Sequence, residues 1–382
     1  MPGRAVPTRI LMVAGEASGD LHGSGVVHAL RALAPEVVVS GIGGDRMKAE
    51  GMELLHHIGD LAFMGFVEVV RNLRTIRRVE RKLERALDEH KPDVVVLIDY
   101  PGFNLRFARA VKARGIPVLY YISPQVWAWH RGRVKTMHPF VDRMDVVFPF
   151  EVEIYREAGI NVAFVGHPLV EHIRVRSTRE DFFRRHGLSS DVPLLALLPG
   201  SRRQEIDRIF PVMLAAADAL CRRGDLQCAV GVAPNLGRGP LETCIPKGAQ
   251  AKLVENETYE LMAYADAAIV TSGTATLETG WFGTPMAVVY RTSLLTYLIG
   301  RLLVRVPYIG LVNIVAGRKV VPEFVQGAMT AEALQNEVGR MLADRTYAQS
   351  IRQDLSVIRK NLGGPGASER VARDILDLAR AA

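Results

Sequence analysis

Residues 267–282 read AAIVTSGTATLETGWF: a short apolar run, then a turn of small and hydroxylic side chains, then a stretch with helical character. This order is typical of a β-strand that passes through a tight turn into an α-helix. Ser, Thr and Gly suit such a turn for two separate reasons. They cap helices, and they let a ligand come close to the backbone. The turn alone does not decide between these two interpretations.

The same unit recurs along the chain and predicts the fold. Apolar runs followed by turns and amphipathic segments occur at 10–13, 37–39, 94–98, 118–122 and 146–148, and again at 194–198, 228–232, 251–254, 267–270 and 286–290. This alternation indicates parallel sheets covered by helices on both faces. Between the two sets, segment 166–177 has little strand-like pattern. The sequence therefore predicts an α/β protein with two Rossmann-like, doubly wound domains that face each other across a cleft.

Composition limits the class of protein and of partner. The chain has 382 residues, 48% of them hydrophobic and 23% charged, which suits two globular domains. Its net charge of +7 favours an anionic partner such as a nucleotide, a nucleic acid or an acidic membrane. Its three cysteines lack paired spacing, which fits a reducing compartment. No stretch approaches the roughly 20 apolar residues of a spanning helix, so we expect a protein that is soluble or lies on a membrane surface.

Ligands of open parallel sheets bind at the carboxyl ends of the strands, so the turns there are the candidate sites. In the second half these turns are LPGSR (198–202), which ends in Arg202, and the turn Ser272, Gly273 and Thr274. Both offer backbone N–H groups to an anion, and Glu278 lies one helical turn further along, within reach of two ligand hydroxyls. Together they favour a diphosphate joined to a ribose. The chain has no D-x-D pair for a divalent ion, so arginines and helix dipoles would neutralise the ligand.

Two turns of the first half carry carboxylates. Asp99 ends the run 94–98 and fits either a general base for a hydroxyl nucleophile or a helix cap, with equal support. GEASGD (15–20) lacks the G-x-G-x-x-G spacing of a dinucleotide site, and its Glu16 would repel a pyrophosphate. Binding of a sugar or acceptor by Glu16 and Ser18, and a plain tight turn, both stay open.

Segment 63–87 joins an apolar stretch to a basic amphipathic helix. The apolar residues include Phe63, Met64, Phe66 and Val67, and the arginine stripe includes Arg74, Arg78 and Arg81. A charge stripe is usually a solvated face, but beside apolar residues it also fits a patch that rests on anionic headgroups. The neighbours are aliphatic more than aromatic, and no nucleic-acid-binding motif accompanies them, which favours a membrane over nucleic acid. Segment 293–312 is again apolar and basic.

Eight motifs occur along the chain in a family-specific order. They are GEASGD (15–20), FMGFVEV (63–69), YYISPQVWAW (120–129), VVFPFE (146–151), VGHPL (165–169), LLPGSR (197–202), SGTATLE (272–278) and NIVAGR (313–318). In this combination the chain resembles the lipid-A-disaccharide synthases from about residue 10 to residue 326, and more weakly to its end. Residues 130–133 and the YPGFN around Asp99 differ from the family's pattern. The resemblance therefore does not assign the ligands of the acceptor phosphate.

The resemblance implies a B-type glycosyltransferase fold, an inverting mechanism and no metal or cofactor. The implied reaction joins a UDP-linked acylated glucosamine donor to an acylated glucosamine 1-phosphate, giving a β-1,6-linked lipid A disaccharide and UDP. Its implied location is the cytoplasmic face of the inner membrane, held peripherally on the anionic surface, with no nucleic acid as partner. The implied domains are an acceptor-binding, membrane-facing domain (1–170), a UDP-sugar domain (171–352) and a C-terminal helix (353–382) that crosses back. A homodimer is compatible with this organisation.

Site residues follow from the matching motifs. Asp99 is the candidate base, with Glu16 as the alternative, and Glu16 and Ser18 would line the acceptor side. The nucleotide positions would be Arg202, Ser272, Gly273, Thr274, Glu278, Asn313 and Gln326. Three other classes stay open: a UDP-sugar epimerase of the same fold, a non-enzymatic membrane- or nucleic-acid-binding module and, with least support, an NAD oxidoreductase.

Overall fold

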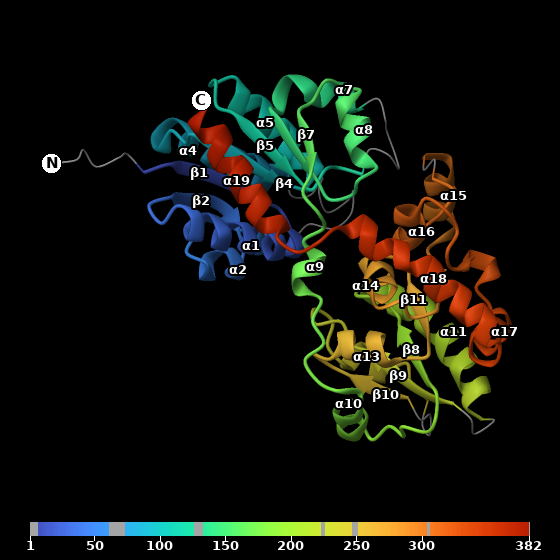
Figure 1. Cartoon of the computed structure of the whole chain (residues 1–382). Helices are drawn as coiled ribbons and strands as arrows, with labels where there is room; N and C mark the ends of the chain where they lie inside the picture. Colours follow the sequence, from blue (N-terminus) through green and yellow to red (C-terminus); the bar gives the residue numbers. More distant parts are fainter. Residues whose placement is uncertain are drawn as a thin grey trace. The chain divides into compact units, whose positions relative to one another are not determined.

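The structure, a computed structural model, describes residues 7–60, 73–125, 133–222, 226–246, 251–303 and 306–381. The chain divides into two compact units (Figure 1). The first unit combines Met1–Glu171 with Leu362–Ala382, and the second is His172–Asn361. Each has its own parallel sheet. These two parallel sheets confirm the predicted doubly wound α/β class.

The described strands of the first unit form a seven-stranded sheet in the order β3-β2-β1-β4-β5-β6-β7. They are β1 (Arg9–Ala14), β2 (Val38–Gly43), β3 (Glu53–His57), β4 (Val94–Ile98), β5 (Val118–Tyr121), β6 (Arg143–Val146) and β7 (Val162–Phe164). All neighbours pair in parallel, with Ala14 opposite Ile98 at the ends of β1 and β4. The prediction missed β3 and β7, and it placed β6 three residues too late.

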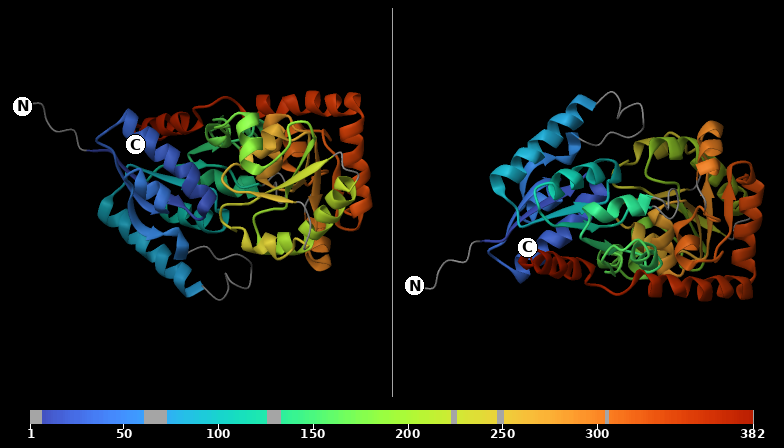
Figure 2. Two further views of the ribbon diagram at one scale, coloured as in Figure 1. Left: turned by 90° about the horizontal axis from the view of Figure 1, so that it is seen from below. Right: turned by 90° about the horizontal axis from the view of Figure 1, so that it is seen from above.

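Helices cover both faces of this sheet. They are α1 (Ala17–Leu33), α2 (Asp45–Ala49), α4 (Leu73–His90), α5 (Pro101–Lys112), α7 (Arg133–Met137), α8 (Glu151–Arg156), α9 (Leu169–His172) and α19 (Ala367–Arg380). Figure 2 shows α4 and α19 on opposite sides of the sheet. Helix α19 packs against α1, so the end of the chain forms part of the first unit's outer layer.

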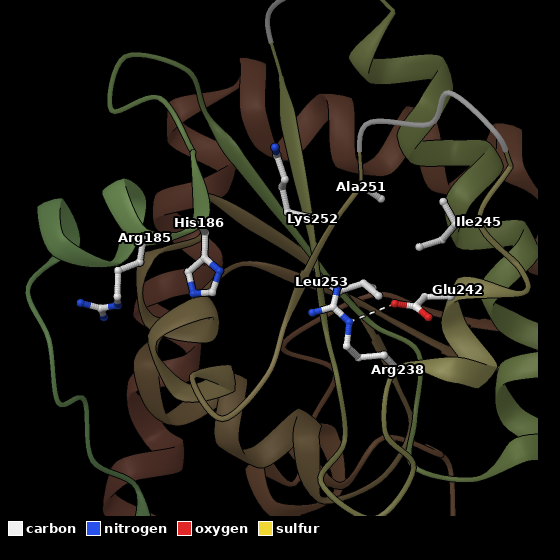
Figure 3. Close-up of a pocket in the computed structure, with 8 residues that line it drawn as sticks. All are labelled: Arg185, His186, Arg238, Glu242, Ile245, Ala251, Lys252 and Leu253. Carbon is white, nitrogen blue, oxygen red and sulfur yellow. Dashed lines mark hydrogen bonds and ion pairs between the residues drawn. The ribbon is translucent and has the colours of Figure 1, made fainter.

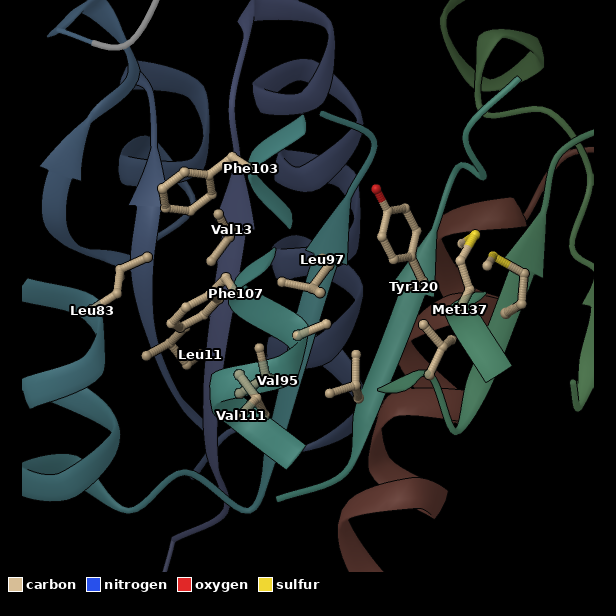
Figure 4. Close-up of a cluster of buried hydrophobic side chains, with 14 of the residues drawn as sticks. Leu11, Val13, Leu83, Val95, Leu97, Phe103, Phe107, Val111, Tyr120 and Met137 are labelled. Atoms are coloured by element: carbon tan, nitrogen blue, oxygen red, sulfur yellow. The ribbon is translucent and has the colours of Figure 1, made fainter. Parts of the chain in front are cut away.

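The core of the first unit follows from the two-residue period of its strands. Alternate side chains such as Leu11, Val95 and Tyr120 point to the face covered by α4 and α5, where Phe103 and Phe107 meet them (Figure 4). Every residue of β4 is fully buried. Burial on both faces is why these strands read as continuous apolar runs rather than as alternating ones.

The second unit repeats this plan. Its described strands form a six-stranded sheet in the order β10-β9-β8-β11-β12-β13. They are β8 (Leu194–Leu198), β9 (Gln227–Gly231), β10 (Lys252–Val254), β11 (Ala267–Thr271), β12 (Met286–Tyr290) and β13 (Glu323–Val325), all parallel. Its helices are α10 (Arg179–His186), α11 (Arg203–Cys221), α12 (Gly239–Glu242), α13 (Thr258–Tyr264), α14 (Thr274–Phe282), α15 (Leu294–Leu303), α16 (Leu311–Ala316), α17 (Ala331–Ala343) and α18 (Arg345–Leu362). The prediction missed β13.

The strand orders locate the edge of each sheet at which a ligand is expected. In the first unit the chain builds outward in both directions from the neighbours β1 and β4, and in the second from β8 and β11. Where the winding direction changes, the turns at the carboxyl ends of the two central strands diverge and leave a place for a ligand. These turns contain Glu16 and Asp99 in the first unit, and segments 199–202 and 272–274 in the second.

Candidate functional site

Asp99 and Glu16 meet at the switch point of the first unit. Glu16 is the N-cap residue of α1, two residues after the end of β1, and Asp99 directly follows β4. The Glu16 carboxyl lies near enough for its negative charge to act on the Asp99 carboxyl. Ser18 Oγ lies 3.0 Å from Glu16 Oε1 and donates to it. The structure therefore brings together the three polar residues that the sequence singles out in this half.

The Asp99 carboxyl is held in its neutral form to an unusually high pH. Burial is the main cause, and the negative charge of Glu16 adds to it, so that the pKa of Asp99 rises to about 7. A backbone hydrogen bond from Tyr100 acts in the opposite direction. A carboxyl with a pKa near 7 can exchange a proton efficiently at neutral pH, as a general base requires.

Close packing under this pair fixes the turn. The ring of Tyr100 lies directly on Gly15, where an added Cβ would fall 2.1 Å from Tyr100 Cγ. Gly15 is thus required by the approach of a ring, not by a phosphate. Behind the turn, the Asp99 carbonyl accepts hydrogen bonds from Tyr120 Oη at 2.5 Å and Asn104 Nδ2 at 2.8 Å. Sequence reasoning missed both of these supporting residues.

The LPGSR turn of the second unit already holds an anion. The backbone N–H groups of Ser201 and Arg202 donate to Glu205 Oε2, at 3.0 and 3.3 Å. Gly200 has φ +108°, and a Cβ there would lie 2.4 Å from the same carboxylate oxygen. Arg202 Nη1 donates to Glu205 Oε1 at 2.9 Å, but its side chain is 60% exposed and has other N–H groups to offer. The guanidinium, more than the turn's backbone, is available to a ligand.

Glu205 was missed in the sequence, although a signal was present. It stands three residues after Arg202, the N-cap of α11, where an acidic side chain often folds back on the start of its own helix. Its side chain is largely buried. The residue organises the loop that presents Arg202.

The TSG turn presents the N-terminus of α14. Gly273 is the N-cap, with φ 154°, and Thr274 is the exposed first residue of the helix. The first N–H groups of a helix have no partner within it, so this end can accept an anion. Ser272 Oγ donates to the Ile309 carbonyl at 2.7 Å, which ties the turn to the segment before α16. Gly273 and Thr274 therefore remain open to a ligand, while the Ser272 hydroxyl proton is already engaged.

Glu278 lies on α14 below this turn. Tyr259 Oη donates to its Oε1 at 3.1 Å. Burial raises the pKa of Glu278 to about 7, and the Tyr259 hydrogen bond opposes the rise. The Glu278 carboxyl therefore also changes charge near neutral pH. It lies at the edge of the second sheet, on the helix whose N-terminus can accept an anion.

Asn313 is fully committed to the protein interior. Its Nδ2 donates to Val321 O and Glu323 Oε1, and its Oδ1 accepts from the backbone N–H groups of Val320 and Val321, all within 3.0 Å. These four bonds use the whole capacity of the amide. The side chain of Asn313 therefore supports its surroundings and has no hydrogen bond left for a ligand.

The partner of Asn313 is a residue that sequence reasoning missed. Glu323, at the start of β13, accepts hydrogen bonds from the backbone N–H groups of Ile309 and Gly310, both at 3.0 Å. The Ile309 carbonyl is the group that binds Ser272. Glu323 thus connects Asn313 to the TSG turn.

Gln326 follows β13 with φ +53°. Its Oε1 accepts from the Thr292 N–H at 3.4 Å, and within the described part of the chain its buried Nε2 has no hydrogen-bond partner. Arg291 holds the turn by donating to the carbonyls of Gln326 and Met329. An unused buried amide at this edge of the sheet fits the predicted ligand-binding role of Gln326.

Helix α4 has the two faces predicted from its sequence. Ile76, Val79 and Leu83 are buried in the core. Arg74, Arg78 and Arg81 are exposed on the other side. The predicted apolar partners Phe63, Met64, Phe66 and Val67 lie outside the described residues. In α15, within the second apolar and basic segment, Leu294 and Leu298 are 71% and 50% exposed.

One pocket, of about 440 Å³, has no residue of these turns in its lining (Figure 3). It is lined by residues that include Arg185, His186, Arg238, Glu242 and Lys252, beside the edge strand β10. The basic groups are mostly paired. Arg238 contacts Glu242 at 3.0 Å, and both Arg185 and His186 contact Glu257. Because most of its charges are paired within the protein, we assign no function to this pocket.

Two wider searches cover the described ranges only. There, no helix combines the length and apolar character needed to cross a bilayer. The same ranges contain no group of three or more His, Cys, Asp or Glu side chains arranged to hold a metal ion.

Comparison with known proteins identifies the family. The family model described as lipid-A-disaccharide synthetase matches residues 10–373. The lipid-A-disaccharide synthase of Syntrophus aciditrophicus is 47% identical over 366 residues, covering 95% of this chain and 96% of that protein. The enzyme of the same name from Myxococcus xanthus is 46% identical, covering 97% and 98%.

Solved structures show the same fold at low sequence identity. UDP-GlcNAc 2-epimerase from Neisseria meningitidis, bound to UDP-GlcNAc, has a TM-score of 0.66 at 12% identity and covers 97% of this chain and 100% of its own. The kitacinnamycin glycotransferase has a TM-score of 0.66 at 15% identity, covering 98% and 100%. The shared fold therefore does not separate transferases from epimerases, whereas the sequence matches do. The protein is a glycosyltransferase that condenses lipid A precursors in lipid A biosynthesis, and the chain belongs to the lipid-A-disaccharide synthase family.

Proposed function

We propose that the protein transfers 2,3-diacylglucosamine from its UDP-linked form to 2,3-diacylglucosamine 1-phosphate. The 6-hydroxyl oxygen of the acceptor attacks the anomeric carbon of the donor while the bond from that carbon to the UDP oxygen breaks. The hydroxyl proton passes to a carboxylate, and UDP leaves with the bonding electrons. Attack opposite the leaving group inverts the anomeric centre and gives a β-1,6-linked disaccharide 1-phosphate.

Asp99 is the proposed base. The observation that carries this assignment is its contact with Glu16 at the switch point, with a pKa near 7. Glu16 keeps that pKa high and, with Ser18, would bind acceptor hydroxyls. Of the two acids, Asp99 is the more buried, so it is the better placed to act on a hydroxyl shielded from water.

UDP would occupy the carboxyl edge of the second sheet. The diphosphate would take the N-terminus of α14 at Gly273 and Thr274, joined by the Arg202 guanidinium. Glu278 would accept the ribose hydroxyls. Asn313 would act indirectly, through Glu323 and the turn that binds Ser272. Gln326 would donate its free Nε2 hydrogens to the ligand.

We also propose peripheral attachment to an anionic membrane, on the cytoplasmic face of the inner membrane. Both substrates carry acyl chains in this proposal, so a bilayer would supply them. The exposed arginines of α4 support it, because each basic side chain near an anionic surface contributes about 1 kcal/mol. The exposed leucines of α15 give the second unit an apolar surface of its own.

An assay for UDP release tests the reaction. It uses both acylated sugars, with each omitted in turn. UDP released only when both are present, together with a new disaccharide, is the expected result. Conversion of the UDP-sugar without acceptor would instead establish an epimerase, an activity that also occurs on this fold.

A further inference from the structure

The turn after β4 has an unfavourable backbone conformation. Asp99 and Tyr100 are consecutive non-glycine residues, and both have φ +46°. In this left-handed region the Cβ of an L-residue crowds the following carbonyl. Such residues keep it only where the surrounding structure holds them there, and this is common where a side chain must be aimed.

Two buried side chains hold this turn. Tyr120 Oη donates to the Asp99 carbonyl at 2.5 Å, and Asn104 Nδ2 donates to the same oxygen at 2.8 Å and to the Ile98 carbonyl at 3.2 Å. Tyr120 and Asn104 are both fully buried, and Figure 4 shows Tyr120 within the core of the first unit. Burial also raises the pKa of Tyr120 well above its ordinary value, so the hydroxyl stays protonated and remains a donor.

We propose that Tyr120 and Asn104 are positioning residues for the base: by fixing the Asp99 carbonyl in the core, they turn its carboxylate toward Glu16. The carbonyl and the side chain leave the same Cα, so fixing one restricts the other. Without the two donors, the turn can relax toward negative φ and carry the carboxylate away. This inference rests on the proposed role of Asp99. A displacement of about 1 Å at a reacting group costs about 100-fold in rate.

Tyr120→Phe tests the inference by deleting one oxygen atom. Tyr121→Phe is its matched control, because Tyr121 is the next residue, is equally buried, points to the opposite face of β5, and has no hydrogen-bond partner for its hydroxyl within the described ranges. We expect Tyr120→Phe to lower kcat by roughly 10- to 100-fold. The KM for the UDP-linked donor should stay within about twofold, since the proposed nucleotide residues belong to the second unit.

The pH profile separates positioning from a general loss of structure. As Asp99 moves away from Glu16, its pKa should fall, so the acidic limb of the kcat profile should shift to lower pH in Tyr120→Phe. In Tyr121→Phe, both kcat and the limb should match wild type. Asn104→Asp, which replaces the donating amide by an acid of the same shape, should repeat the Tyr120→Phe result.

Every outcome decides the question. Wild-type kcat in Tyr120→Phe, an equal loss in Tyr121→Phe, or a loss of kcat without the pH shift would each overturn the inference. If Tyr120→Phe does not fold although Tyr121→Phe does, the hydroxyl serves stability and the inference fails. Asp99→Asn separates the two proposals: full turnover in that variant removes the base itself. If Asp99→Asn loses turnover while Tyr120→Phe keeps the wild-type kcat, Asp99 remains the base and only the positioning role of Tyr120 is refuted.

Discussion

Replacing Asp99 by asparagine should stabilise the protein while it lowers turnover. Burial and the charge of Glu16 raise the pKa of Asp99 from 3.8 to about 7. A pKa difference of about three corresponds to about 4 kcal/mol. At a pH where the carboxyl is ionised in both the native and the unfolded state, the free energy of unfolding is lower by this amount. Asparagine has the same shape and never ionises, so the variant should regain it.

The sign of the pH dependence follows from the two states. The native protein keeps the Asp99 proton up to about pH 7, whereas the unfolded chain releases it near pH 4. The unfolded state binds fewer protons between these values, so wild-type stability falls there as pH rises. Variant and wild type should melt together below pH 4. They should differ by on the order of 4 kcal/mol above pH 7, or roughly 8–16 °C for a unit of this size.

Thermal unfolding between pH 4 and 9, together with the UDP-release assay, measures both effects. Turnover should fall by about 10²- to 10⁴-fold, the usual contribution of a general base. Asp377→Asn, at a side chain 73% exposed on α19, is the control and should change neither the melting curve nor turnover. A melting temperature that does not rise with pH relative to wild type would refute the account of the buried carboxyl. Near-normal turnover would refute its role as base.

Three further predictions concern the nucleotide side and the membrane. The pKa of Glu278 is about 7, and its ionised form would accept the ribose hydroxyls. UDP affinity, measured by calorimetry, should therefore fall as the pH drops below 7. The Glu278→Gln variant should bind UDP about tenfold more weakly, with no such pH dependence. Glu323→Gln replaces an oxygen acceptor by a donor opposite backbone N–H groups, so it should cost about 1–3 kcal/mol in denaturant unfolding and weaken UDP binding. Reversal of Arg74, Arg78 and Arg81 to Glu should lower the affinity for anionic vesicles, measured by co-sedimentation, at least about 100-fold.

Matched variants decide these three cases. Glu332→Gln, at an exposed position on α17, should leave stability and UDP binding unchanged. Reversal of Arg208, Arg345 and Arg352, three exposed arginines of the second unit, changes the net charge equally and should retain vesicle binding. If both triple reversals act alike, net charge and not the α4 face is responsible. If Glu278→Gln titrates as wild type does, another group controls the affinity.

The sequence predicts well what depends on local pattern. Buried parallel strands are continuous apolar runs, so most central strands and the turns after them were located to within a residue or two. The missed strands β3, β7 and β13 are edge strands, and their residues are only partly buried. Polar or short segments such as ELLHH and EFV carry too weak a pattern to be distinguished from loops.

What the sequence did not provide is the set of contacts between distant segments. Asn313 matches a family motif, which suggests a ligand contact, but its four hydrogen bonds all go to segment 320–323. Tyr120 is 21 residues from Asp99, and only the pairing of β4 with β5 brings its hydroxyl to the turn. Supporting residues of this kind follow from sheet register, which a single sequence does not fix.

The acidic side chains at the two candidate edges differ in their electrostatic surroundings. In the second unit, the buried Glu205 and the partly buried Glu323 accept hydrogen bonds from backbone N–H groups, so the loops they contact are already ordered before any ligand binds. In the first unit, Asp99 faces another carboxyl from a strained turn, which is costly in the resting protein. A binding surface that is already ordered loses less entropy when a ligand binds. A general base, in contrast, needs a carboxylate in surroundings that favour its protonation. This difference supports the proposal that one edge recognises UDP and the other transfers the proton.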